Sequence, residues 1–183
     1  LLCVQQCRTF SDLLITTRTI IIVKNALHSH RIGIQPLKGH GAFDLVFEHG
    51  ARFAYRGVTG FLLFRHTLQT SEKSGLSELD RFRAVPADTL LVGVSAKRRT
   101  RPAVMRNRIK RLLRTSVQKA LWDAGSLPFD MQREPCPIVA IVLICNIVPA
   151  KPSLLHLTDI QPLVERIFQN ADKHFRSKHH PSN

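Results

Sequence analysis

A nearly unbroken apolar stretch, PIVAIVLICNIV at residues 137–148, constrains the fold of this chain most strongly. A run of this length without polar alternation is typical of a strand that is buried on both faces of its sheet. With this stretch as the last strand, the whole pattern predicts the order helix, strand, strand, helix, strand, helix. The predicted helices are residues 41–48, 103–121 and 158–175, the other predicted strands are 58–64 and 89–95 with a further candidate at 51–57, and 66–88 is a polar loop.

The charge of the chain is concentrated in one block. The 183 residues contain 27 Lys and Arg against 13 Asp and Glu, a formal net charge of +14. Residues 91–120 hold ten of the basic residues and no acidic one. A solvated surface normally mixes both signs through pairs one helical turn apart, so an acid-free block favours a phosphate-bearing partner over a merely soluble surface.

The basic block coincides with the strongest predicted helix. Placed at about 100° per residue, residues 103–121 form an apolar arc that packs on a sheet, and most basic groups fall opposite this arc. Arg106, Lys110 and Arg114 follow one another along one ridge. The predicted arc consists of Met105, Ile109, Leu112, Leu113, Ser116 and Ala120.

The ends of the chain differ from its middle. Residues 1–36 are rich in Ser and Thr and show no helix or strand period, so we expect an extension that is disordered or precedes the true start. The folded domain is expected at 37–176, with a disordered tail at 177–183.

No spanning segment is recognised, so no membrane partner is expected. Four cysteines without a CxxC spacing indicate reduced thiols in a cytoplasmic protein, whereas a zinc site from Cys3, Cys7, His28 and His30 is a poor match to known ligand spacings.

Two sequence blocks carry a family resemblance. VGVSAKRR at residues 92–99, followed by AVMRNRIKRLLR at 103–114, resembles the signature of the bacterial ribonuclease P protein component. The RNRIKRLLR run is the most specific part, and FDLVFEHG at 43–50 is similar to that family's first helix. The order of elements agrees across residues 37–176.

The resemblance implies both a fold and a role. The fold would be an α/β (α+β) two-layer sandwich with a small central sheet, like domain 2 of ribosomal protein S5, including a left-handed βαβ crossover against the usual right-handed rule. The chain would be the protein subunit of an endoribonuclease that removes the 5′ leader of precursor tRNA. A partner RNA would perform the hydrolysis with Mg²⁺ that it mainly binds itself, and the protein would be monomeric within the ribonucleoprotein.

Carried over by position, the resemblance also implies two sets of contact residues. The aromatic set would form a cleft for the leader of the precursor. From the residues alone, core packing is the better explanation of Phe43 and Phe47, and only the resemblance makes a cleft role as good an explanation. Strand alternation lets at most one of Phe61 and Phe64 face the cleft. The RNA-binding set is Ser95, Lys97, Arg98, Arg99, Arg106, Asn107, Arg108, Lys110, Arg111 and Arg114, and the leader-binding set is Phe43, Phe47, Phe61 and Phe64.

No catalytic or metal-binding residues of the protein's own are predicted. A protein nuclease needs clustered carboxylates for metals or a pair of histidines for proton transfer. Glu78 and Asp80 are the nearest candidates, but they stand beside Arg81 in a polar segment and are better explained as solvated charges. The alternative to a ribonuclease P subunit is a non-enzymatic basic RNA-binding protein of the ribosomal or RNA-chaperone type.

Overall fold

A computed structural model describes residues 32–70, 77–97, 100, 102–122, 136–147 and 155–179 of the chain. The expectations for residues 1–31 and 180–183, and the four candidate zinc ligands, lie outside these residues. Ile32 to Asn183 form one compact unit. No helix in the described ranges combines the length and apolar character that crossing a membrane requires.

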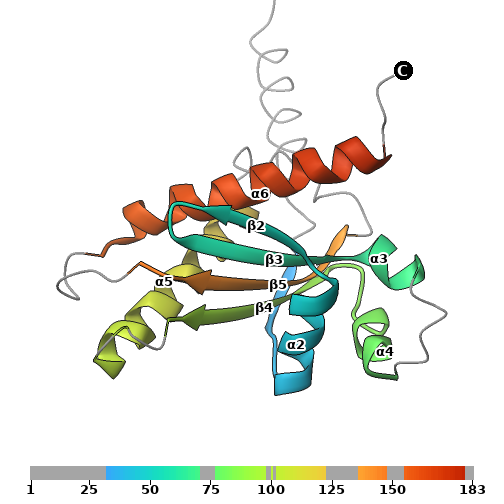
Figure 1. Ribbon diagram of the computed structural model, residues 1–183, viewed down its shortest axis with the longest axis horizontal. Coiled ribbons are helices and arrows are strands. Elements are labelled where there is room, and N and C mark those ends of the chain that lie inside the picture. The colour runs from blue at the N-terminus through green and yellow to red at the C-terminus, as the bar shows by residue number, and fades with distance from the viewer. Residues whose placement is uncertain are drawn as a thin grey trace, which may run out of the picture. The chain divides into compact units, whose positions relative to one another are not determined.

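The core of this unit is a five-stranded mixed sheet with the strand order β1-β4-β5-β3-β2. The strands β1, β4 and β5 are parallel to one another, and β3 pairs antiparallel with both β5 and β2. Figure 1 shows β5 between β3 and β4. The strands are β1 Gly33–Pro36, β2 Ala51–Tyr55, β3 Val58–Phe64, β4 Thr89–Ala96 and β5 Ile138–Cys145.

The strand β5 confirms the central expectation from the sequence. Seven of its eight residues are buried, and it pairs along its length with β3 on one side and β4 on the other. A strand in this position has no face in contact with water, which explains why its sequence does not alternate. The neighbouring β2 and β3 are joined by a two-residue turn at Arg56 and Gly57, both with positive φ (41° and 85°), as hairpin turns with the right twist require.

Helices cover both faces of the sheet. The long helices α5 and α6 pack against each other and lie on one face, α5 against β4 and α6 against β2 and β3. The shorter α2 lies on the other face against β3 and β5, with α4 beside it (Figure 1). The helices are α2 His40–His49, α3 Arg65–Thr70, α4 Ser77–Arg83, α5 Ala103–Trp122 and α6 Leu157–His179.

Two apolar cores result from this arrangement. The larger core lies between the sheet and α5 and α6, and includes Ile109, Ile141 and Phe168. The smaller core lies under α2 and α4 and includes Val46 and Phe82. The α/β sandwich is therefore confirmed, with α2 and α4 adding a partial layer on the second face. The path β4, α5, β5 is a parallel βαβ unit, and its left-handed crossover stays a prediction.

Three regions of the chain differ from the sequence-based expectations. The polar segment 66–88 was expected to be a loop, and this is wrong because it contains most of α3 and all of α4. The strand β1 lies within the 1–36 range assigned to the extension, where its pairing with β4 gives it a place at the edge of the sheet. At the other end, α6 continues to His179, beyond the residue at which the domain was expected to end.

Candidate nucleic-acid interface

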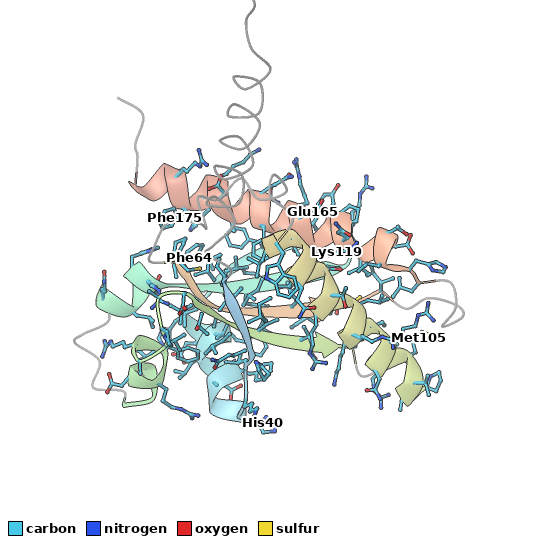
Figure 2. The ribbon with its side chains drawn as sticks, turned by 180° about the vertical axis from the view of Figure 1, so that it is seen from behind. His40, Phe64, Met105, Lys119, Glu165 and Phe175 are labelled. Carbon is cyan, nitrogen blue, oxygen red and sulfur yellow. The ribbon has the colours of Figure 1, made fainter. Side chains whose placement is uncertain are left out.

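The basic helix α5 is fixed to the sheet by its apolar face. Leu112 is half-buried at the margin of this face, and the Ser116 hydroxyl donates a 2.9 Å hydrogen bond to its carbonyl. The predicted arc is confirmed, and Val117 joins it. Figure 2 shows α5 from its own side of the sheet, with Met105 near its start and Lys119 near its end. The buried residues are Met105, Ile109, Leu113, Ser116, Val117 and Ala120.

The outer face of α5 presents cations without carboxylate partners. Arg111 and Arg114 are exposed, Lys110 is half-buried, and Asn107 is exposed beside them. Within the described residues, none of the three basic side chains forms a hydrogen bond or an ion pair. Lys110 and Arg114 are one helical turn apart, where like charges repel. An anionic partner would remove that repulsion, so this face is a candidate phosphate-binding surface.

The two arginines near the start of α5 are engaged within the protein. Arg106 Nη1 donates to the carbonyl oxygen of Thr100 at 3.1 Å. Arg108 Nε and Nη2 both donate to the carbonyl oxygen of Leu155, at 3.2 and 3.0 Å. Because Leu155 lies two residues before the start of α6, Arg108 links α5 to the segment that leads into α6. Both arginines keep their positive charge but have fewer free donors for RNA than Arg111 and Arg114.

The predicted strand-end residues lie where β4 leaves the sheet. Lys97 is exposed, and its backbone N–H donates to the Cys145 carbonyl at 3.1 Å, which extends the pairing of β4 with β5. Ser95 is half-buried and is in register with Ile144, on the face of the sheet that carries α2. Arg98 and Arg99 lie outside the described residues. The end of β4 therefore lies between two surfaces: the basic helix α5 on one face of the sheet and Ser95 on the other.

Three of the four predicted aromatic residues come together on the α2 face. The ring centroids of Phe43 and Phe47 on α2 are 6.4 Å apart, and Phe47 stands edge-on to Phe61 of β3 at 4.9 Å. The Phe47 side chain is 38% exposed, whereas Phe43 and Phe61 are half-buried. A Cβ atom at Gly93 would lie 2.8 Å from Cε1 of Phe43, so only glycine lets this ring lie so close to β4. The cluster therefore packs at its base and remains open at Phe47.

The prediction of Phe64 as a cleft residue is wrong. Phe64 follows Phe61 by three residues in β3, an odd spacing that places its side chain on the opposite face of the sheet. It is 2% exposed in the larger core and stacks on Phe175 of α6 at 5.8 Å. This position excludes contact with a ligand on the α2 face.

The sheet beside the aromatic cluster carries a residue that the sequence analysis missed. Arg52 of β2 is exposed and lies in register with Phe61, so both side chains are on the α2 face. The signal in the sequence is the alternation in β2, where Phe53 and Tyr55 pack against the larger core and the residues between them point away. Arg52 thus brings a cation to the edge of the aromatic cluster.

Several other arginines serve internal contacts. Arg65 donates to the carbonyl oxygens of Cys136, Val85 and Pro86 at 2.6–3.1 Å and so links the segment before β5 to the connection between α4 and β4. Arg83 and Arg176 form ion pairs with carboxylates on their own helices. The donors of these arginines are therefore used within the protein, whereas Lys110, Arg111 and Arg114 of α5 make no such contact in the described residues.

Titratable groups within the described ranges form no catalytic constellation. No three His, Cys, Asp or Glu side chains come together there as metal ligands. Of the two carboxylates considered above, Asp80 is paired with Arg83 at 2.6 Å. Burial raises the pKa of the Cys136 and Cys145 thiols, which favours their protonated, less reactive form.

A family model described as Ribonuclease P matches residues 34–130, from β1 past the end of α5. A search of curated proteins finds no match.

Two solved structures are similar in fold. One is the RNase P protein of Staphylococcus aureus, at 17% sequence identity and a TM-score of 0.48, with 74% of this chain and 94% of that chain covered. The other is a mutant of the same Staphylococcus aureus protein with defective mRNA degradation activity, at 15% identity and a TM-score of 0.47, with 85% and 96% covered.

Proposed function

Because the chain belongs to the ribonuclease P protein family, whose model matches 97 of its 183 residues, we propose that it is the protein subunit of a ribonuclease P. In this role it binds a catalytic RNA and the 5′ leader of precursor tRNA and promotes removal of the leader, which gives the mature 5′ end. The observation that carries the proposal is the outer face of α5, where Lys110, Arg111 and Arg114 have no acidic partner in the described residues.

The outer face of α5 is proposed as the surface for the catalytic RNA. Its spacing suits a polyanion, because Arg111 and Arg114 are about 4.5 Å apart along the helix axis and both reach solvent. Each phosphate that these cations neutralise would release a counterion, so the affinity should fall steeply with salt. The strand-end residues, including Lys97, Arg98 and Arg99, are proposed to extend the same surface.

The cluster of Phe43, Phe47 and Phe61 is proposed to receive the leader. An unpaired base can stack on an aromatic ring whatever its identity, which suits a leader of variable sequence. The exposed ring of Phe47 supports this role, and Arg52 beside Phe61 is placed to meet a backbone phosphate.

The catalytic chemistry is proposed to reside in the RNA. When bound to the RNA, Mg²⁺ would activate water and stabilise the leaving oxygen at the cleaved phosphodiester. The described residues of this chain offer no set of ligands that fits a metal ion, so we assign them no part in holding it. Their contribution is to hold the precursor by its leader and to offset phosphate repulsion in the complex. We propose that one copy of the chain acts in each complex, in the cytoplasm.

A non-enzymatic RNA-binding protein is the alternative, and a comparison of substrates separates the two. The complex of the chain with a bacterial catalytic RNA should bind a precursor tRNA more tightly than the mature tRNA, and the RNA alone should distinguish them less. Phe47→Ala should reduce this preference, whereas Phe175→Ala, an aromatic truncation on the opposite face, should leave it intact. Equal affinity of the complex for both tRNAs would contradict the proposal.

A further inference from the structure

A small cavity beside the start of α2 has no role in the function proposed above. From its walls we infer that it is a second RNA-binding site, which holds one unpaired nucleotide with its base on the apolar floor and its flanking phosphates at Lys38 and Arg81. The choice of RNA as ligand rests on the proposed function. The cavity has a volume of about 190 Å³ and is lined by Pro36, Leu37, Lys38, Gly41, Ala42, Leu45, Arg81, Phe82 and Leu91.

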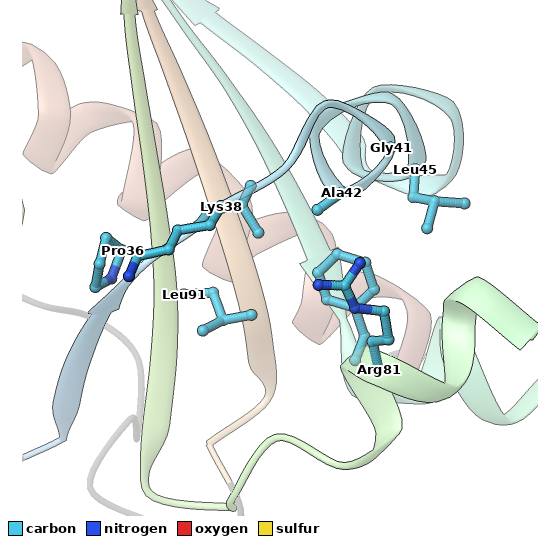
Figure 3. A pocket seen from close by; sticks show the side chains of 9 residues that line it. Pro36, Lys38, Gly41, Ala42, Leu45, Arg81 and Leu91 are labelled. Atoms are coloured by element: carbon cyan, nitrogen blue, oxygen red, sulfur yellow. The ribbon is translucent and has the colours of Figure 1, made fainter.

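The walls of this cavity are held by well-anchored elements. Leu37 continues the pairing of β1 with β4, because its N–H donates to the Val92 carbonyl at 3.1 Å. On the other side, α4 is fixed by Leu79 and Phe82, which are both buried in the smaller core. Figure 3 shows Lys38 and Arg81 on opposite sides of the cavity, with Leu91 of β4 between them. The two cations therefore stand at defined places on the rim.

Within the part of the chain that the structure describes, no acidic side chain pairs with Lys38 or Arg81. Asp80 is the nearest acid to Arg81 in sequence, but it pairs with Arg83 at 2.6 Å. Neither Lys38 nor Arg81 forms a hydrogen bond or an ion pair with the described residues, and both are exposed. The nine lining residues include two cations and no acid. The site thus attracts an anion that also has an apolar part.

The size of the cavity limits what that ligand can be. Sites for drug-sized molecules measure about 300–1,000 Å³, so this cavity admits a single ring-sized group. A nucleotide in a strand has a base with two apolar faces and a phosphate on either side, which matches an apolar floor between two cations. The carboxylate of an acidic peptide could reach the cations but would leave the floor of Leu37, Phe82 and Leu91 uncovered.

The cavity is separate from the aromatic cluster. On α2, the lining residues Gly41, Ala42 and Leu45 fall on one side of the buried Val46, and Phe43 and Phe47 fall on the other. A ligand in the cavity therefore touches a different side of this helix from a leader on Phe47. The bound nucleotide can come from the catalytic RNA or from the precursor, which share the same chemistry.

The test compares two double variants that remove the same charge. Lys38→Gln/Arg81→Gln changes the cavity, and Arg166→Gln/Lys173→Gln changes two exposed cations of α6, whose helix lies on the other face of the sheet. The affinity of the full chain is measured against salt for two RNAs separately, a bacterial catalytic RNA and a precursor tRNA with a single-stranded leader. Each lost phosphate contact to a single strand lowers the slope of log affinity against log salt by about 0.7.

The expected result is a slope that falls by about 1.4 for the cavity variant on one of the two RNAs, which identifies the source of the nucleotide, while the α6 variant keeps the wild-type slope. Wild-type slopes for the cavity variant on both RNAs, equal losses for both variants, or no binding of either RNA by the wild type would overturn the inference. Cleavage is scored separately. If the wild type binds RNA but does not promote cleavage, the proposed function fails while the slopes still decide the cavity.

Discussion

Neutralising the outer face of α5 should weaken RNA binding in a way that depends on salt. In Arg111→Gln/Arg114→Gln, two exposed guanidinium groups that make no internal contact in the described residues are lost. Surface changes of this kind alter the free energy of unfolding by no more than about 0.5 kcal/mol. Each phosphate contact to a duplex contributes about 0.9 to the slope of log affinity against log salt. The slope for the catalytic RNA should therefore fall by about 1.8 when both contacts are lost.

This change of slope has a measurable consequence. Between about 50 and 200 mM salt, the wild type should lose about 12-fold more affinity than the variant does. Filter binding or fluorescence anisotropy across that range measures both slopes. The matched control is Arg166→Gln/Lys173→Gln, which removes the same charge from α6 and should keep the wild-type slope. If the two double variants lose slope equally, the reasoning that α5 is the contact surface is refuted.

Arg108 provides an internal contrast on the same helix. Its guanidinium donates twice to the Leu155 carbonyl, so Arg108→Gln removes a link between α5 and the segment that leads into α6. A hydrogen bond of a charged group contributes about 1.5–3 kcal/mol. Because both bonds share one acceptor, we expect the loss of the pair to lower the free energy of unfolding by about 1–3 kcal/mol. Urea unfolding measures it. An unchanged free energy of unfolding together with a slope lowered by about 0.9 would make Arg108 a phosphate contact alone.

Further variants test the two faces of the sheet and the buried thiols. Phe47→Ala should weaken precursor binding by about 1–3 kcal/mol and cost about 1 kcal/mol of stability, whereas Phe64→Ala should cost about 3–5 kcal/mol of stability; similar unfolding curves for both would contradict this assignment. Gly93→Ala should push away the ring that lies over it, lowering the free energy of unfolding by about 1–3 kcal/mol and weakening leader binding; no change in either quantity would refute the close approach. Because burial raises the pKa of Cys136 and Cys145 in the folded protein, the unfolded chain releases these protons first, and stability should fall as the pH rises past 9.0. Cys136→Ala/Cys145→Ala should flatten this part of the pH profile, and an unaltered profile would count against the raised pKa values.

The long elements of the fold could be predicted because their own sequence determines their pattern. The strand β3 has the predicted bounds, β4 and α5 agree within one residue, and β5 lies inside the predicted range 137–148 but ends three residues earlier. In each case the spacing of buried residues is the spacing that the element imposes, at 3.6 residues per turn in α5 and without alternation in β5. A continuous pattern over seven or more residues is compatible with few alternative secondary structures.

The short elements could not be predicted because tertiary contacts stabilise them. Among the described side chains of α4, two are buried anchors, Leu79 and Phe82, and both depend on α2 and the sheet for their burial. The strand β1 has four residues, three of them exposed, and it exists through its pairing with β4. Isolated helices and strands of this length are unstable in water, so their sequences carry no distinct period.

The candidate site was predictable on α5 and only partly so elsewhere. Absence of acids in residues 91–120 was visible in the sequence, and so was the opposite parity of Phe61 and Phe64. Which of these two rings faces α2 depends on which face of the sheet each helix covers, and no local sequence pattern predicts that choice. The carbonyl contact of Arg108 is 47 residues away in sequence, so its structural role required the fold.

We propose that this chain assists an RNA which itself cleaves precursor tRNA. The most direct measurement is the initial rate of 5′-leader removal by a bacterial catalytic RNA at low Mg²⁺, with and without an equimolar amount of the chain. We expect slow cleavage by the RNA alone, faster cleavage at the same bond when the chain is added, and none with the chain alone. Cleavage by the chain without RNA, or no acceleration when both are present, would contradict the claim.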